Sequence, residues 1–153
     1  MEIKRDRYLK KLINSQWDGQ VKVITGIRRC GKSYLLRNLF KNYLSEQGVK
    51  AEQILSIELD LTKHIRFRNP LELSAHVRKL VEGKPEKFYL FIDEIQMSDI
   101  VRNPYNPESR KITFYDALND LRELENLDVY VTGSNSKMLS SDILTEFREK
   151  KKK

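Results

Sequence analysis

Cysteine and histidine are scarce in this sequence, and their scarcity excludes two kinds of chemistry. The chain has one cysteine, so no intramolecular disulfide can form, which fits a reducing compartment and leads us to expect a cytoplasmic protein. The two histidines, His64 and His76, have no neighbours at the spacing of metal ligands, and we interpret both as ordinary surface residues.

Long hydrophobic runs are also missing. No apolar stretch approaches the ~20 residues that a helix needs to span a bilayer. Residues 1–6 are mostly charged and lack the apolar core of a signal peptide. We therefore expect no secretory leader and no membrane partner.

The positive charge is concentrated at one end of the chain. The net charge is +7, but four of the lysines are residues 150–153, and the rest of the chain carries only +3. A lysine tail either contacts nucleic acid or an anionic membrane, or is simply a solvated end. Because 153 residues suffice for one hydrophobic core, we interpret residues 1–148 as one domain and residues 149–153 as a basic tail.

Short apolar segments of two kinds alternate along the chain. Alternating or continuous apolar stretches predict strands, and apolar residues at helical spacing predict helices. Predicted strands cover residues 21–25, 53–59, 88–92 and 127–132. Predicted helices cover residues 7–14, 33–46, 70–81, 113–124 and 137–147, and residues 62–69 are interpreted as a polar loop. This alternation predicts a three-layer α/β fold with a mostly parallel sheet.

A glycine-containing loop lies between the first predicted strand and the helix that follows it. The pattern G-x-x-x-x-G-K-S in this strand–loop–helix context predicts a phosphate-binding loop, the Walker A motif. Glycines let the backbone fold around a phosphate, and amide groups of the loop and helix N-terminus face the anion. Lys32 adds a charge for the β- and γ-phosphates, and Ser33 offers a hydroxyl to Mg²⁺. The residues expected to bind the nucleotide are Gly26, Ile27, Arg28, Arg29, Cys30, Gly31, Lys32, Ser33 and Tyr34.

Two acidic residues follow a second apolar run. Residues 89–92 are apolar and lead into Asp93 and Glu94, the Walker B pattern. In parallel α/β sheets, ligands bind at the carboxyl ends of the strands. Asp93 is therefore predicted to hold Mg²⁺ together with Ser33, and Glu94 is predicted to be the general base that activates the attacking water.

Small polar residues follow the last predicted strand. Ser134 or Asn135 is predicted to orient the attacking water between Glu94 and the γ-phosphate, and a plain turn is the alternative.

Three further features have two interpretations each. Trp17 either stacks on an adenine base or packs under the sheet. Cys30 is either a small filler in the loop or a thiol whose oxidation blocks nucleotide binding. Residues 97–111 form either a partner-binding loop or a disordered insertion.

Three segments together resemble one protein family. They read V-I-T-G-I-R-R-C-G-K-S at residues 23–33, F-I-D-E-I-Q at residues 91–96 and V-T-G-S-N-S at residues 131–136. They are similar to the AAA-like ATP-binding proteins of bacteria and archaea, in which an N-terminal ATPase domain precedes a C-terminal domain of poorly defined function. The resemblance covers about residues 7–148. It implies ATP and Mg²⁺ as cofactors, an AAA-like core with strand order 5-1-4-3-2, and the roles given above for the site residues.

The resemblance also implies a fifth core strand and a helical lid beyond the segment similar to residues 139–148, and we predict neither from the residues. Without a fifth strand, residues 21–25 would form a sheet edge with unpaired backbone groups. We therefore expect edge pairing, seen as a dimer or another homo-oligomer. We also expect a crippled ATPase, because an arginine finger contributes about 10³–10⁵ in rate to related reactions.

These patterns predict a Mg-ATP-binding P-loop domain whose complete form hydrolyses ATP by attack of water on the γ-phosphate. The alternative is a nucleotide-dependent module that binds a protein or DNA with little or no turnover. A GTPase is disfavoured because no N-K-x-D motif occurs, and a small-molecule kinase is disfavoured because an arginine-rich lid is missing.

Overall fold

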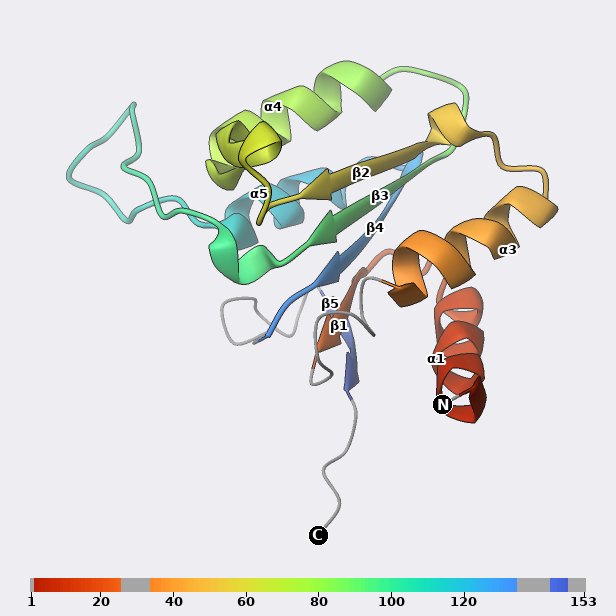
Figure 1. Ribbon diagram of the computed structural model, residues 1–153. Coiled ribbons are helices and arrows are strands. Elements are labelled where there is room, and N and C mark those ends of the chain that lie inside the picture. The colour runs from red at the N-terminus through yellow and green to blue at the C-terminus, as the bar shows by residue number, and fades with distance from the viewer. Residues whose placement is uncertain (1, 26–33, 135–143, 149–153) are drawn as a thin grey trace, which may run out of the picture.

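A parallel sheet forms the centre of the computed structural model, which describes residues 2–25, 34–134 and 144–148 (Figure 1). Its strands are β1 Val21–Thr25, β2 Ile54–Glu58, β3 Phe88–Asp93, β4 Leu127–Thr132 and β5 Leu144–Arg148. Their order across the sheet is β2-β3-β4-β1-β5, and every neighbouring pair is parallel. This order confirms the strand order that the family resemblance implies.

The predicted absence of a fifth strand is wrong. β5 pairs with β1 over five positions, from Val21 opposite Leu144 to Thr25 opposite Arg148. The helix predicted over residues 137–147 is therefore wrong for residues 144–147, and residues 137–143 lie outside the described residues. The open side of β1 offers backbone partners that local periodicity does not reveal. β1 lies inside the sheet, so the reason for expecting edge pairing through it is removed.

Helices cover both faces of the sheet (Figure 1). One face carries α4 (Pro70–Val81) and α5 (Phe114–Leu121), and the other carries α1 (Glu2–Asn14) and α3 (Lys41–Glu46). A π-helical segment, Leu35–Phe40, leads directly into α3. The predicted three layers are confirmed.

Local capping explains where two of these helices begin. Pro70 stands at the first turn of α4, and the Asn69 side chain accepts hydrogen bonds from the Leu71 and Glu72 amides. Before α5, the Thr113 amide donates to Asp116, which closes a capping box. These caps fix the residues at which α4 and α5 begin.

The core has two parts, one on each side of the sheet. Alternate residues of β3 point to opposite faces, so Phe88, Leu90 and Ile92 pack toward α4 and α5, whereas Tyr89 and Phe91 pack toward α1 and the Leu35–Phe40 segment. All residues of β1, β3 and β4 are buried, which explains their nearly continuous apolar runs.

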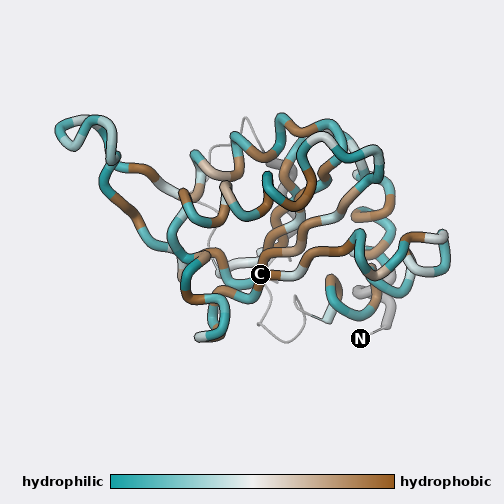
Figure 2. The backbone as a smooth tube through the Cα atoms, turned by 90° about the horizontal axis from the view of Figure 1, so that it is seen from above, coloured by the Kyte–Doolittle hydropathy of each residue, from teal (hydrophilic) through white to brown (hydrophobic). Residues whose placement is uncertain are grey.

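The connections differ from the sequence prediction in detail. Thr62–Arg68 and Ile95–Met97 form short 3₁₀ segments, the first where we predict a polar loop. Residues 98–112 project from the core as a polar loop, closed at its base by backbone pairing of Val101 with Ile112 (Figures 1 and 2). Tyr105 in this loop is 96% exposed. Among the described residues, no helix combines the length and apolar character that crossing a membrane requires.

A buried charge pair lies near the amino ends of the strands. Lys22 of β1 is fully buried, and its Nζ donates to Asp128 Oδ1 of β4 at 2.5 Å. Asp128 Oδ2 accepts from the Tyr130 hydroxyl (2.5 Å) and from the Trp17 amide (2.9 Å). Burial and the nearby carboxylate raise the pKa of Tyr130, so its hydroxyl stays a donor.

Candidate nucleotide site at the carboxyl edge of the sheet

The carboxyl ends of β3, β4 and β1 lie side by side, because these strands are parallel neighbours. Their last residues, Asp93, Thr132 and Thr25, are all buried. The predicted phosphate loop, residues 26–33, follows Thr25 in sequence and lies outside the described residues, as does Asn135. The described part of the site therefore consists of the carboxyl ends of these strands and the residues that contact them.

Asp93 is oriented by the neighbouring strand. Thr132 Oγ1 donates to Asp93 Oδ1 at 3.1 Å, and the Glu94 amide donates to Thr132 Oγ1 at 3.1 Å. On the other side, the Asp93 carbonyl accepts from the Leu59 amide at 3.1 Å. The carboxylate is thus held at the strand end with one oxygen engaged by a buried hydroxyl.

Arg37 brings a positive charge to the same carboxylate. Arg37 lies on the Leu35–Phe40 segment, and its Nε is 3.2 Å from Asp93 Oδ2. Its Nη1 donates to Glu58 Oε1. Glu58 ends β2 and is registered directly opposite Asp93. The guanidinium therefore bridges two carboxylates on adjacent strand ends.

Glu94 is held in an unusual backbone conformation. Its φ of 62° and ψ of 56° are left-handed, which is uncommon for a residue with a side chain; this conformation costs about 1–3 kcal/mol and persists only where the surroundings enforce it. Gln96 Nε2 donates to Glu94 Oε1 at 2.5 Å, and Gln96 Oε1 accepts from the Ser134 amide at 3.2 Å. Gln96 thus connects the Glu94 carboxylate to the segment that follows β4.

Gly133 permits this close approach. A Cβ at Gly133 would lie 2.7 Å from Ile95 Cγ1 and 3.3 Å from Gln96 Oε1. The Gly133 amide donates to the Ile24 carbonyl at 3.2 Å. The absence of a side chain here keeps the ends of β4 and β1 against the Ile95–Met97 segment.

The structure places some predicted site residues together and shows others that sequence reasoning missed. Asp93, Glu94 and Ser134 meet at one edge, with Ser134 contributing its backbone amide, and Tyr34 is an exposed residue just before the Leu35–Phe40 segment. The residues missed are Thr132, Arg37, Glu58 and Gln96. Thr132 and Gln96 stand within the quoted motifs, and their polar character next to a strand end was a usable signal. Arg37 and Glu58 carry no local signal.

Trp17 lies away from this edge. Its ring packs against Tyr89 in an edge-to-face arrangement at 5.3 Å, and its Nε1 donates to the Tyr89 hydroxyl at 3.2 Å. Tyr89 is near the amino end of β3, four residues before Asp93, or about 13 Å along a strand. Of the two interpretations of Trp17, packing under the sheet is confirmed.

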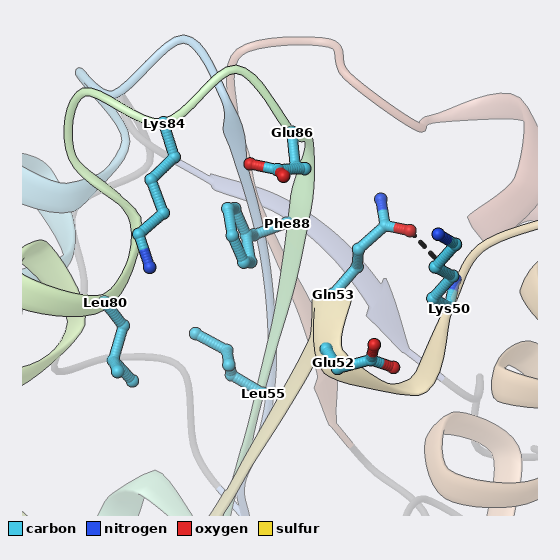
Figure 3. A pocket seen from close by; sticks show the side chains of 8 residues that line it. All are labelled: Lys50, Glu52, Gln53, Leu55, Leu80, Lys84, Glu86 and Phe88. Carbon is cyan, nitrogen blue, oxygen red and sulfur yellow. Dashed lines mark hydrogen bonds between the residues drawn. The ribbon is translucent and has the colours of Figure 1, made fainter.

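Two surface cavities also lie at the amino edge. The first, of about 360 Å³, has Leu55, Leu80 and Phe88 turned into it and Lys84 and Glu86 along its rim (Figure 3). The second, of about 280 Å³, is lined by residues that include Trp17 and Asp128. Both are remote from Asp93 along the strands, so neither belongs to the candidate nucleotide site.

The donor set at Asp93 suits a magnesium ion held partly by phosphate. Among the described residues there is no group of three or more His, Cys, Asp or Glu side chains that could hold a metal. Mg²⁺ in nucleotide sites needs only one or two protein ligands, with phosphate and water completing its shell. The Arg37 guanidinium next to Asp93 Oδ2 shows that this oxygen accepts a cation. Asp93 therefore fits the role of the carboxylate ligand.

The parallel order with β1 between β4 and β5, and the acidic pair at the end of β3, define a P-loop NTPase fold of the AAA type. Comparison with protein families agrees, since the family described as "AAA domain" matches residues 18–153. The chain therefore belongs to this AAA domain family.

Relatives in this family are longer than the chain. An uncharacterized protein of Haemophilus influenzae is 31% identical over 143 residues, which cover 94% of this chain and 32% of the relative. The uncharacterized protein MJ1544 of Methanocaldococcus jannaschii is 30% identical over 150 residues, covering 95% of this chain and 27% of the relative. The chain thus spans about a third or less of these relatives.

Solved structures share the fold at low sequence identity. A Drosophila ORC complex with AT-rich DNA and Cdc6 matches with a TM-score of 0.58 and 11% identity, covering 95% of this chain and 53% of that one. A DNA polymerase III gamma subunit-related protein of Thermotoga maritima matches with a TM-score of 0.57 and 13% identity, covering 96% and 46%. These likenesses establish the fold alone.

Proposed function

We propose that this chain is the ATPase core of an AAA protein, which binds Mg-ATP at the carboxyl edge of its sheet and hydrolyses ATP in its complete form. The observation that carries the proposal is the hydrogen-bonded series Asp93–Thr132–Glu94, next to the end of β1 and the G-x-x-x-x-G-K-S sequence. Asp93 and Ser33 would hold Mg²⁺, which when bound neutralises charge on the β- and γ-phosphates.

Each residue then has a defined task. Residues 26–34 bind the phosphates, with Lys32 as the charged member. Thr132 donates to Asp93 and so would keep its carboxylate in one orientation, and the left-handed turn at Glu94 would bring a second carboxylate beside the phosphates. Glu94 accepts a proton from the attacking water while the water oxygen bonds to the γ-phosphorus. The bond between the γ-phosphorus and the oxygen that bridges to the β-phosphate breaks in the same step. Ser134 or Asn135 orients that water.

The test is calorimetric titration with Mg-ATP and Mg-GTP, with phosphate release followed in the same samples. We expect ATP binding in the wild type, at least tenfold weaker binding in Lys32→Ala, and nearly unchanged binding with lost turnover in Glu94→Gln. Binding that survives Lys32→Ala at wild-type strength would refute a phosphate-loop site.

A second function has support from the contacts of Glu94. Because Gln96 engages one Glu94 carboxylate oxygen, the chain by itself suits a nucleotide-dependent module that binds a protein or DNA with little turnover. Some solved structures of the same fold are DNA-bound ORC complexes. Tight Mg-ATP binding without phosphate release, in the wild type and in Gln96→Ala, would favour the module over the ATPase.

The proposal extends to the whole protein. Because the relatives are roughly three to four times as long, we propose that residues 1–148 act as an ATPase domain whose nucleotide state is transmitted to a further domain, and that assembly of copies completes the site. Sedimentation with and without Mg-ATP tests the assembly.

A further inference from the structure

The bridge through Arg37 joins three elements at the candidate site. The Arg37 side chain is 40% exposed, Glu58 is 19% exposed and Asp93 is 5% exposed. Different nitrogens serve the two carboxylates, since Nε faces Asp93 and Nη1 binds Glu58. The guanidinium can therefore keep Glu58 when its contact with Asp93 is lost.

We propose that Arg37 competes with the divalent cation for Asp93. Glu58 favours binding of the cation, because it holds the guanidinium away from Asp93. The inference rests on the proposed function, because a nucleotide site is what gives Asp93 a divalent cation to bind. Two residues outside the nucleotide-binding motifs thereby gain a role. Arg37 is the internal counter-ion of Asp93, and Glu58 is the carboxylate that draws the Arg37 guanidinium away from Asp93.

Electrostatics gives the direction of each effect. Two cations at one carboxylate repel each other, so an arginine on Asp93 Oδ2 weakens the binding of a divalent cation there. Removing the Arg37 charge should therefore tighten cation binding. Removing the Glu58 charge leaves Asp93 as the remaining carboxylate of the bridge, so the arginine stays on Asp93 more of the time and cation binding weakens.

The chain offers a matched control pair. Arg66 Nε and Glu72 Oε1 form an ion pair at 2.8 Å, with both side chains well exposed, on the Thr62–Arg68 segment and α4. Neither residue has a described contact with Asp93. Arg66→Ala and Glu72→Gln thus remove the same charges from the surface without touching the bridge.

The experiment measures affinity for a fluorescent ADP analogue, first in EDTA and then across a Mg²⁺ titration. ADP is used because it has no γ-phosphate to hydrolyse, so turnover does not enter. We expect Arg37→Ala to lower the half-saturating Mg²⁺ concentration about fivefold, and Glu58→Gln to raise it about twofold, as partly exposed ion pairs allow. The double variant should follow Arg37→Ala, and the two control variants should match the wild type.

The outcomes separate this inference from the proposed function. ADP binding in EDTA that Lys32→Ala abolishes supports the nucleotide site, and a wild-type circular dichroism spectrum of the Arg37 and Glu58 variants shows that they fold. An unchanged or raised Mg²⁺ requirement in Arg37→Ala overturns the competition. An unchanged or lowered requirement in Glu58→Gln overturns the role of Glu58. No ADP binding by the wild type refutes the proposed function, and the inference with it.

Discussion

Asp128 is a buried carboxylate that is surrounded by hydrogen-bond donors. It is 3% exposed and accepts hydrogen bonds from Lys22, Tyr130 and Trp17. A buried ion pair contributes little net stability compared with apolar residues, because both charges lose their hydration. Removing one partner is costly, because the other charge remains buried without compensation.

We predict that Asp128→Asn lowers the free energy of unfolding by about 2–4 kcal/mol, since it removes one of the two carboxylates at the buried Lys22 ammonium and leaves Asp18, 3.0 Å away, as the other. Urea denaturation followed by circular dichroism measures this. The control is Glu72→Gln, which removes a carboxylate that is 47% exposed and paired with Arg66, and this change should cost about 1 kcal/mol or less. Equal losses in the two variants would contradict the prediction.

Charged residues differ in how far the sequence could predict their contacts. Asp93 and Glu94 follow an apolar run, and a buried strand that ends in acids is a local signal. Lys22 and Asp128 stand 106 positions apart, and Lys22 sits in an alternating stretch where an outward direction is the natural expectation. Only the packing of β1 against β4 brings these charges together. The same holds for Arg37, whose partners lie on two other strands.

At the scale of elements, a histidine joins β2 to the 3₁₀ segment Thr62–Arg68. His64 Nδ1 accepts from the Glu58 amide at 2.9 Å, which only an unprotonated nitrogen can do. Burial, and next the charge of Lys63, lower the pKa of His64 below 6.5. Because the folded pKa is lower than the unfolded one, this contribution is fully present above pH 6.5 and is lost as pH falls through the folded pKa.

We predict that His64→Ala costs about 1 kcal/mol at pH 7.5 and less as the pH falls below 6.5 and through the folded pKa, where the wild type loses the same bond. Urea denaturation of both proteins across this pH range gives the difference. The pKa of His76 is lowered mainly by burial and in part by the charge of His64, so the comparison is made in a His76→Ala background in which this second imidazole does not titrate. A cost that stays constant with pH would argue against the hydrogen bond.

Elements with their own periodicity were predictable, and those set by tertiary pairing were not. α4 and α5 carry capping signals and one apolar face each, so their existence follows from local sequence. β5 has no such pattern: Leu144 and Phe147 are spaced as on a helix, and pairing with β1 decides the conformation. The left-handed turn at Glu94 is likewise imposed by Thr132 and by the fold around it.

At the scale of the whole molecule, β5 decides whether β1 is covered. We predict that a chain ending at residue 143 is less stable by about 2–5 kcal/mol, because five registered positions of β1 lose their backbone partners. It should also associate through the exposed strand. A chain ending at residue 148 is the control, and thermal denaturation with size-exclusion chromatography compares the two. Equal stability and equal elution for both chains would show that β5 adds nothing.

The sheet separates two sets of charges by its full strand length. Lys22 and Asp128 are fixed at the amino ends, whereas Arg37, Glu58 and Asp93 meet at the carboxyl ends. The packed core of β1, β3 and β4 therefore lies between the charged residues of the amino edge and those of the carboxyl edge.

Trp17 is the single tryptophan of the chain, and it lies at the amino edge with Tyr89 beneath it and the Lys87 ammonium 5.0 Å from its ring centre. This placement gives the protein an intrinsic fluorophore whose surroundings all lie at the amino edge of the sheet. We expect its emission to report whether α1, β3 and β4 remain assembled, because its ring and amide contact residues packed on these elements. The indole therefore suits measurements of unfolding, and a label at the other end of the strands suits measurements of nucleotide binding.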